Sequence, residues 1–205
     1  PFDGQFHMSQ APLQQFYIPE EQSIYLLSHD DARKLKEWVA LCRAQLEQLG
    51  YRDIELIGKG AYGFVFAGIT AHGEEYVFKF TRVNLPQQLQ DRLEEEAFML
   101  EQVDHPRVPR LIAYQRVRNQ SILVMQRAPG LNLEEVSLRE GRLPPRLVVR
   151  IADQLADILR SLRHETGQAG RPIVHGDIKP SNLVFDARRE SIALIYWGSS
   201  VFAQL

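Results

Sequence analysis

The sequence predicts an α+β fold with a β-rich first lobe, an internal helix in that lobe and a shortened helical second lobe. Three observations support this fold class. Four short runs have the pattern of strands, at residues 54–56, 64–66, 75–80 and 121–125, and the last of them is predicted to be a buried strand. Apolar stripes at helical spacing occupy residues 28–49, 89–103 and 147–162. Two further β runs, at residues 183–185 and 192–195, are joined by a short polar link that predicts a hairpin.

Composition and periodicity divide the 205 residues into four segments. Residues 1–7 lack periodicity and are interpreted as a remnant of a cloning junction. Residues 8–50 form an N-terminal extension, with a helix at 28–49 that a capping signal at Ser28 opens and Gly50 closes. Residues 51–128 form the first lobe and residues 129–205 the second.

The composition excludes several functional classes. A formal net charge of −2 argues against proteins that coat nucleic acid or bind a membrane surface, since these are normally basic. Cys42, the single cysteine, precludes an intramolecular disulfide and a cysteine-rich zinc site, and we expect it to lie in the core. The sequence has no apolar run that approaches the ~20 residues of a transmembrane helix and no secretory signal at its start. We therefore expect a cytoplasmic protein, or alternatively an effector delivered into a host cytosol.

A glycine-rich segment joins two predicted strands of the first lobe. Gly58, Gly60 and Gly63 have the spacing GxGxxG, which also occurs in dinucleotide-binding folds. In those folds the third glycine opens a helix, whereas here a β-branched and aromatic run follows. Such a loop between strands can place backbone N–H groups over nucleotide phosphates. A plain glycine hairpin remains the alternative.

A lysine and a glutamate in the first lobe are candidates for an ion pair. Alternation puts Lys79 on the strand face opposite its phenylalanine neighbours. Glu96 falls on the inward stripe of the following helix, whereas we expect Glu94 and Glu95 to be solvated. Burying either charge alone is costly, and the two are compatible as an ion pair in which Glu96 holds a phosphate-binding Lys79. A solvated lysine and a glutamate at the helix rim remain the alternatives.

The most specific signal lies between an apolar pair and a strand, in residues 173–184. Asp177 can orient a hydroxyl group and accept its proton. Lys179, two residues later, can neutralise a phosphoryl group during transfer. Asn182, five residues after the aspartate, can bind a divalent metal through its amide oxygen. The combination predicts phosphoryl transfer.

Together with His105-Pro106 and the His175-Gly176-Asp177 run, these motifs resemble the eukaryotic-like protein kinases from Tyr51 onward. The resemblance implies ATP and Mg²⁺ as cofactors, with Asp177, Lys179, Lys79 and Glu96 as catalytic residues. It also implies an ATP site in which Met125 is the gatekeeper residue and Arg127 a hinge neighbour. The residues of that site would be Gly58, Gly60, Gly63, Val65, Val77, Lys79, Met125, Gln126, Ala128 and Val184. The residues of a spine linking the lobes would be Leu100, Leu111, His175 and Trp197.

The sequence departs from the family pattern at two functional positions. Gly176 replaces the arginine that reads a phosphate on the activation loop in the family, so we expect that control to be missing. Tyr196 occupies the position of the metal-binding aspartate, and a neutral phenol is a poor magnesium ligand. Asn182 alone would hold Mg²⁺ weakly, so we expect weakened or absent metal binding and a loss of transfer on the order of a thousandfold.

Seven residues follow Gly198 in the sequence, which suggests a minimal or truncated second lobe. A truncated lobe would expose part of the helix at 147–162 and so favour self-association or a partner over that surface. The partners expected are ATP and an unspecified protein, with no nucleic acid and no membrane.

Two functional hypotheses follow from the resemblance. The first is a Ser/Thr protein kinase-like phosphotransferase with Asp177 as the base, impaired by Tyr196. The alternative is a pseudokinase that binds nucleotide or acts as a scaffold. A small-molecule kinase is less favoured. The resemblance implies that a lysine at the position of Lys179 is typical of Ser/Thr protein kinases, whereas small-molecule kinases of similar sequence often carry a different residue there.

Overall fold

The computed structural model describes residues 32–204, apart from 61–62, 84, 118–119 and 165–169. The chain divides into two compact units. The first contains Pro1–Glu95 and Leu111–Arg127, and the second contains Glu96–Arg110 and Ala128–Leu205. None of the helices in the described ranges has the length and apolar character needed to cross a membrane.

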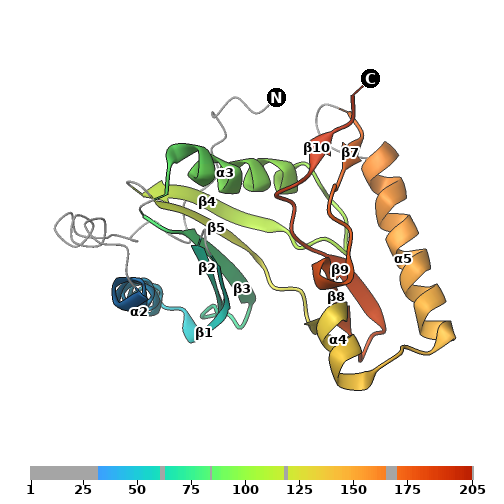
Figure 1. Cartoon of the computed structure of the whole chain (residues 1–205), viewed down its shortest axis with the longest axis horizontal. Coiled ribbons are helices and arrows are strands. Elements are labelled where there is room, and N and C mark those ends of the chain that lie inside the picture. Colours follow the sequence, from blue (N-terminus) through green and yellow to red (C-terminus); the bar gives the residue numbers. More distant parts are fainter. Residues whose placement is uncertain (1–31, 61–62, 84, 118–119, 165–169, 205) are drawn as a thin grey trace. The chain divides into compact units, whose positions relative to one another are not determined.

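The first unit is built on an antiparallel five-stranded sheet (Figure 1). Its strands are β1 (Arg52–Lys59), β2 (Gly63–Ile69), β3 (Glu75–Thr81), β4 (Leu111–Val117) and β5 (Gln120–Gln126), in the spatial order β1-β2-β3-β5-β4. Four of these strands were predicted from the sequence. The sequence pattern did not predict β4, which pairs with β5 along its length.

Alternation gives this sheet two different faces. One face carries stacked and edge-on phenylalanine rings, with Phe64 opposite Phe80 and Phe66 opposite Phe78. The helix α2 (Ala32–Gln48) covers this face and buries its own apolar stripe against it. The core of the unit therefore lies between α2 and the sheet, and the opposite face is left for Lys79 and its neighbours.

The helix α2 has the stripe and the ending that its sequence predicts. Trp38, Cys42 and Leu46 are buried, and burial raises the pKa of the Cys42 thiol. Gly50 takes φ +96°, and its N–H donates to Glu47 O at 3.0 Å while Tyr51 N–H donates to Leu46 O at 3.2 Å. This is a Schellman ending. The capping signal at Ser28 lies outside the described residues.

One prediction about the helix α3 (Gln87–Glu101) is wrong. Glu94 was expected in solvent, but only 7% of it is exposed. Arg116 on β4 reaches it, with Nη2 3.5 Å from Glu94 Oε2 and 2.8 Å from Asp91 Oδ1. Arg116 belongs to β4, a strand that sequence periodicity did not predict. The position of Glu94 on the helix therefore did not indicate that its carboxylate would be buried.

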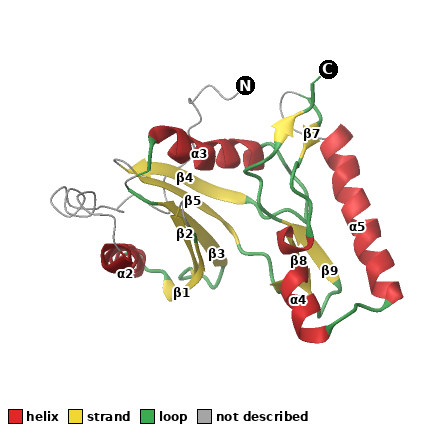
Figure 2. Cartoon of the chain, in the orientation of Figure 1, coloured by secondary structure: helices red, strands yellow, loops and turns green. Residues whose placement is uncertain are grey.

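The described part of the second unit combines helices with three short strand pairings (Figure 2). Its elements are β6 (Leu131–Asn132), α4 (Leu133–Glu140), α5 (Pro145–His164), β7 (Ile173–Val174), η2 (Pro180–Asn182), β8 (Leu183–Asp186), β9 (Ser191–Leu194) and β10 (Val201–Phe202). The predicted hairpin is confirmed as the antiparallel pair β8 and β9. β6 adds to its free side, and β10 pairs with β7.

The helix α3 crosses the boundary between the units, since its last turns, from Glu96, group with the second unit. The loop after it is fixed there by two contacts. His105 Nε2 lies 3.1 Å from Asp157 Oδ2 of α5, and Leu194 N–H donates to Arg107 O at 2.9 Å. The end of α3 and the hairpin β8–β9 therefore belong to one body.

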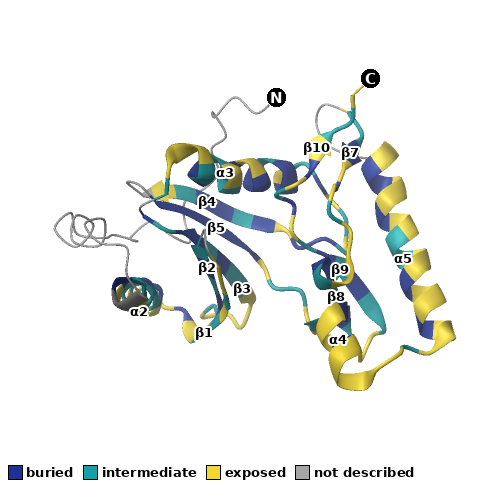
Figure 3. Cartoon of the chain, in the orientation of Figure 1, coloured by how far each residue is buried: buried dark blue, intermediate teal, exposed yellow. Residues whose placement is uncertain are grey.

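The long helix α5 is amphipathic, with a narrower buried stripe than its sequence suggests (Figure 3). Gln154 ties it to the hairpin, donating to Glu190 O at 3.0 Å and accepting from Ile192 N–H at 2.9 Å. The apolar side chains of Val148 and Leu159 remain 51% and 41% exposed. Part of the apolar surface of α5 is therefore exposed. Self-association or binding of a partner at this surface stays a prediction.

Replacing Arg116 with methionine should lower the free energy of unfolding by about 1–3 kcal/mol, because Glu94 would stay buried without its cation. Chemical denaturation measures the loss. The double variant Arg116→Met/Glu94→Gln removes the stranded charge and should recover part of the stability. Equal instability of the single and double variants would contradict the role of this ion pair.

Candidate functional site

The segment between β7 and η2 brings three of the predicted site residues together. Asn182 Nδ2 donates to the backbone oxygen of Asp177 at 2.8 Å and to its carboxylate Oδ2 at 3.0 Å. Lys179 Nζ lies 3.5 Å from the same Oδ2. The Asp177 side chain is 30% exposed, so its carboxylate is oriented from two sides and still reaches solvent.

Local geometry explains why residues five apart in sequence meet. Pro180 opens the short helix η2, and Asn182 N–H donates to Lys179 O at 2.9 Å. This single turn folds the chain back, so that Asn182 is 7% exposed and its side chain faces Asp177. Asn182 O then accepts from Ile195 N–H at 2.9 Å, which joins the turn to the end of the hairpin.

His175 is buried and forms hydrogen bonds with the backbone of the same segment. Its Nδ1 accepts from Asp177 N–H at 3.1 Å, and its Nε2 lies 2.9 Å from Ile195 O. Because a carbonyl oxygen only accepts, Nε2 carries the proton and Nδ1 does not. Burial lowers the pKa of His175, so the neutral ring is favoured. The ring meets the Trp197 indole edge-on, with centroids 4.8 Å apart.

Gly176 has a packing role that the sequence did not reveal. Its φ is +85°, a conformation that side chains disfavour. A Cβ at this position would lie 2.6 Å from Ser199 O. The absence of an arginine here therefore coincides with a close approach between the segment that carries Asp177 and the backbone after Gly198.

Glu96 contacts this backbone as well. Its Oε1 accepts from Trp197 N–H at 3.3 Å, and both residues are buried, at 4% and 1% exposure. The Trp197 indole N–H donates to Leu194 O at 3.2 Å, which closes the turn after β9. Glu96 is thus inward as its helical position predicts, and the contact with Trp197 was not foreseen. Its pairing with Lys79 stays a prediction.

Tyr196 adopts a conformation that is unusual for its residue type. Its φ is +59°, which asparagine and aspartate tolerate better than a bulky aromatic residue. The side chain is 40% exposed and folds over Gly198, where a Cβ would meet the phenol ring at 3.2 Å. The backbone at this position therefore suits aspartate better than the tyrosine that occupies it.

The two positions expected to bind magnesium carry no carboxylate. Mg²⁺ is held mainly by carboxylates. Asn182 uses its amide nitrogen for Asp177, which leaves one neutral amide oxygen, and Tyr196 adds only a phenol. Weakened magnesium binding at these two positions stays a prediction.

The three glycines of the predicted phosphate-binding loop differ in the room that the structure leaves for a side chain. Gly63 is required by packing, because a Cβ there would lie 1.9 Å from Phe80 O. Gly58 has ordinary contact with Val65, at 3.5 Å. Gly60 has open space around its missing Cβ, and its N–H donates to Gly63 O at 2.9 Å. The fold itself therefore does not explain a glycine at residue 60.

Several residues expected to surround a nucleotide share one face of the sheet. Val65 lies opposite Lys79, and Val77 lies opposite Met125, on the face away from the phenylalanine core. Gln126 ends β5 and is exposed. Ala128 and Val184 belong to the second unit. Their part in a common ATP site stays a prediction.

Replacing Gly176 with alanine should lower the free energy of unfolding by about 1–3 kcal/mol more than Gly141→Ala does. Gly141 also has a positive φ, +76°, but its missing Cβ has open space, so it controls for backbone conformation alone. Thermal and chemical denaturation compare the two variants. Equal losses would mean that the approach to Ser199 O does not constrain the segment.

Comparison with known proteins gives the same assignment as these motifs. A family model described as the protein kinase domain matches residues 51–204. The chain is 31% identical over 139 residues to serine/threonine-protein kinase dkf-2 of Caenorhabditis briggsae, covering 66% of this chain and 11% of that protein.

Two bacterial proteins are also similar. Serine/threonine-protein kinase C of Synechocystis is 28% identical over 65% of this chain and 26% of its own length. Serine/threonine-protein kinase pkn2 of Myxococcus xanthus is 30% identical over 72% of this chain and 18% of its own length. The chain thus spans about a quarter or less of these relatives. Because the family model covers most of the sequence, and the α+β architecture agrees, the chain belongs to the protein kinase domain family.

Proposed function

We propose that this chain binds ATP and is a protein kinase-like phosphotransferase of the Ser/Thr type, with its transfer step impaired at Tyr196. The observation that carries the proposal is the arrangement of Asp177, whose carboxylate is held by Asn182 and flanked by Lys179. The family match and the Ser/Thr kinases among the relatives support it.

The chemistry proposed for Asp177 is that of a general base. A substrate hydroxyl oxygen attacks the γ-phosphorus of ATP, the bond from that phosphorus to the ADP oxygen breaks, and the hydroxyl proton passes to the Asp177 carboxylate. Lys179 places a positive charge beside this carboxylate, where it can offset charge on the phosphoryl group. Asn182 fixes the rotamer of Asp177, so the carboxylate is oriented before substrate arrives.

Impairment follows from the donor atoms at residues 182 and 196. Members of this family use a divalent cation to neutralise the transferring phosphoryl group, an effect worth several kcal/mol. An amide oxygen and a phenol do not replace that charge. At about 1.4 kcal/mol for each tenfold change in rate, a loss on the order of a thousandfold is expected.

A second candidate is a pseudokinase that binds nucleotide and acts through contacts. The same observation at Tyr196 favours it, since a protein without a metal-binding carboxylate can keep the fold and lose transfer. A small-molecule kinase is less favoured because of Lys179. Under both leading candidates the glycine-rich loop binds phosphate, so its test comes first.

Replacing Gly60 with alanine should weaken ATP binding roughly two- to tenfold without lowering the thermal unfolding temperature. The added methyl meets no protein atom, so the fold tolerates it, but it obstructs the approach of a phosphate to the backbone. Calorimetric titration with ATP measures the affinity. Unchanged affinity would argue against a phosphate-binding loop.

Replacing Tyr196 with aspartate should make ATP affinity depend on Mg²⁺ and raise transfer to a generic protein substrate on the order of a thousandfold. Stability should not fall, because aspartate suits φ +59° better than tyrosine does. Asp177→Asn in the Tyr196→Asp background is the control and should abolish the gain. If Tyr196→Asp gains no transfer and the control changes nothing, the phosphotransferase proposal is wrong and the pseudokinase stands.

A further inference from the structure

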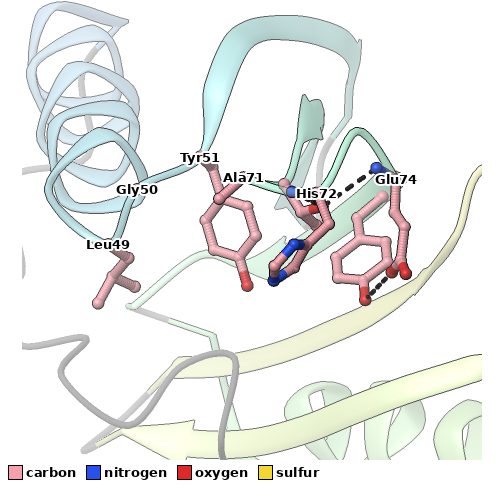
Figure 4. Close-up of a pocket in the computed structure, with 8 residues that line it drawn as sticks. Leu49, Gly50, Tyr51, Ala71, His72 and Glu74 are labelled. Atoms are coloured by element: carbon pink, nitrogen blue, oxygen red, sulfur yellow. Dashed lines mark hydrogen bonds between the residues drawn. The ribbon is translucent and has the colours of Figure 1, made fainter.

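A small pocket lies in the first unit (Figure 4). It is lined by side chains from the end of α2, from the residue before β1 and from the turn between β2 and β3. Its volume is about 250 Å³. That is smaller than the sites that bury a whole drug-sized ligand and sufficient for a single side chain. The residues that define it are Leu49, Tyr51, Thr70, His72, Glu74 and Tyr76.

The walls of the pocket are held in place by local hydrogen bonds. The Schellman ending of α2 fixes Gly50 and Tyr51. Across from it, Thr70 N–H donates to Glu74 O at 2.8 Å, and Thr70 Oγ1 accepts from the N–H groups of His72 and Glu74 at 3.2 and 3.1 Å. The hairpin turn is therefore a defined structure, and the pocket exists before any ligand binds.

The lining combines aromatic rings with one carboxylate. The Tyr51 and Tyr76 rings are 6.2 Å apart at 50°, and the His72 side chain also lines the pocket (Figure 4). Glu74 Oε2 accepts from the Tyr76 hydroxyl at 2.8 Å, which holds the carboxylate at the rim. Among the residues that line the pocket there is no lysine or arginine.

We propose that this pocket binds a cationic side chain, the guanidinium of an arginine or the ammonium of a lysine, carried by a protein partner. The faces of tyrosine rings attract cations, and the carboxylate of Glu74 adds a charged acceptor at the edge. The apolar parts of Leu49 and the rings suit the aliphatic stem of such a side chain. The first 31 residues of the sequence contain no lysine or arginine, so that segment does not supply the cation.

The test uses N-acetyl-arginine methylamide as the probe, titrated into the ¹⁵N-labelled full chain and followed by NMR. We expect saturable shifts in the amides of residues 70–76. N-acetyl-citrulline methylamide, the neutral analogue, should bind about tenfold more weakly. Equal binding of the two probes would overturn the proposal. Methylguanidinium binding as tightly as the arginine probe would also overturn it, because the site would then serve a free cation.

Matched variants distinguish binding in the pocket from non-specific electrostatic attraction to the surface. Glu74→Gln should weaken arginine binding roughly two- to fivefold, whereas Glu75→Gln removes the same charge from the neighbouring exposed residue and should have no effect. Tyr76→Leu removes one ring and should weaken binding as well. Circular dichroism confirms that each variant is folded. Equal effects of Glu74→Gln and Glu75→Gln would show non-specific attraction and would contradict the proposal.

Discussion

The segment that carries Asp177, Lys179 and Asn182 depends on a short stretch of backbone, residues 195–199. Ile195 O accepts a hydrogen bond from His175 Nε2–H, and Ile195 N–H donates to the backbone oxygen of Asn182. Two residues on, Trp197 N–H donates to the carboxylate of Glu96. Gly176 approaches Ser199 O so closely that a side chain would not fit. Removing these backbone contacts would leave Asp177 without the neighbours that orient it.

This dependence explains how the segment tolerates Tyr196. The hydrogen bonds described above are made by backbone atoms of Ile195 and Trp197, and the Tyr196 ring lies over Gly198. These hydrogen bonds do not use the side chain of residue 196. The proposed phosphotransferase and the alternative pseudokinase therefore share one structure with Tyr196 in place, and they differ in whether any phosphoryl transfer remains.

The first unit separates its stability from its chemistry by using the two faces of one sheet. Phenylalanine side chains and α2 form the core on one face, and Lys79 with its valine neighbours occupies the other. The pocket around Glu74 lies at a third place, where the hairpin turn meets the end of α2. Changes at this pocket can therefore be made without touching the residues proposed to bind ATP.

Much of the fold and site was predictable because the signals were local. The stripe of α2, its glycine ending, the alternation of β3 and the hairpin β8–β9 each depend on residues close in sequence. The same holds for Asp177, Lys179 and Asn182, which one helical turn brings together. Periodicity and spacing predict such features, because the interacting residues are only a few positions apart in the sequence.

The tertiary structure alone decided the features that need distant partners. β4 was not predicted, and Glu94 is buried because Arg116 reaches it from that strand. The contact between Glu96 and Trp197 joins residues 101 positions apart, and the pairing of β10 with β7 rests on two residues from each strand. Val148 and Leu159 have the spacing of core residues and remain exposed. Sequence determines which side chains can be buried, and only the packing of distant elements supplies the cation, hydrogen bond or apolar surface that decides which are.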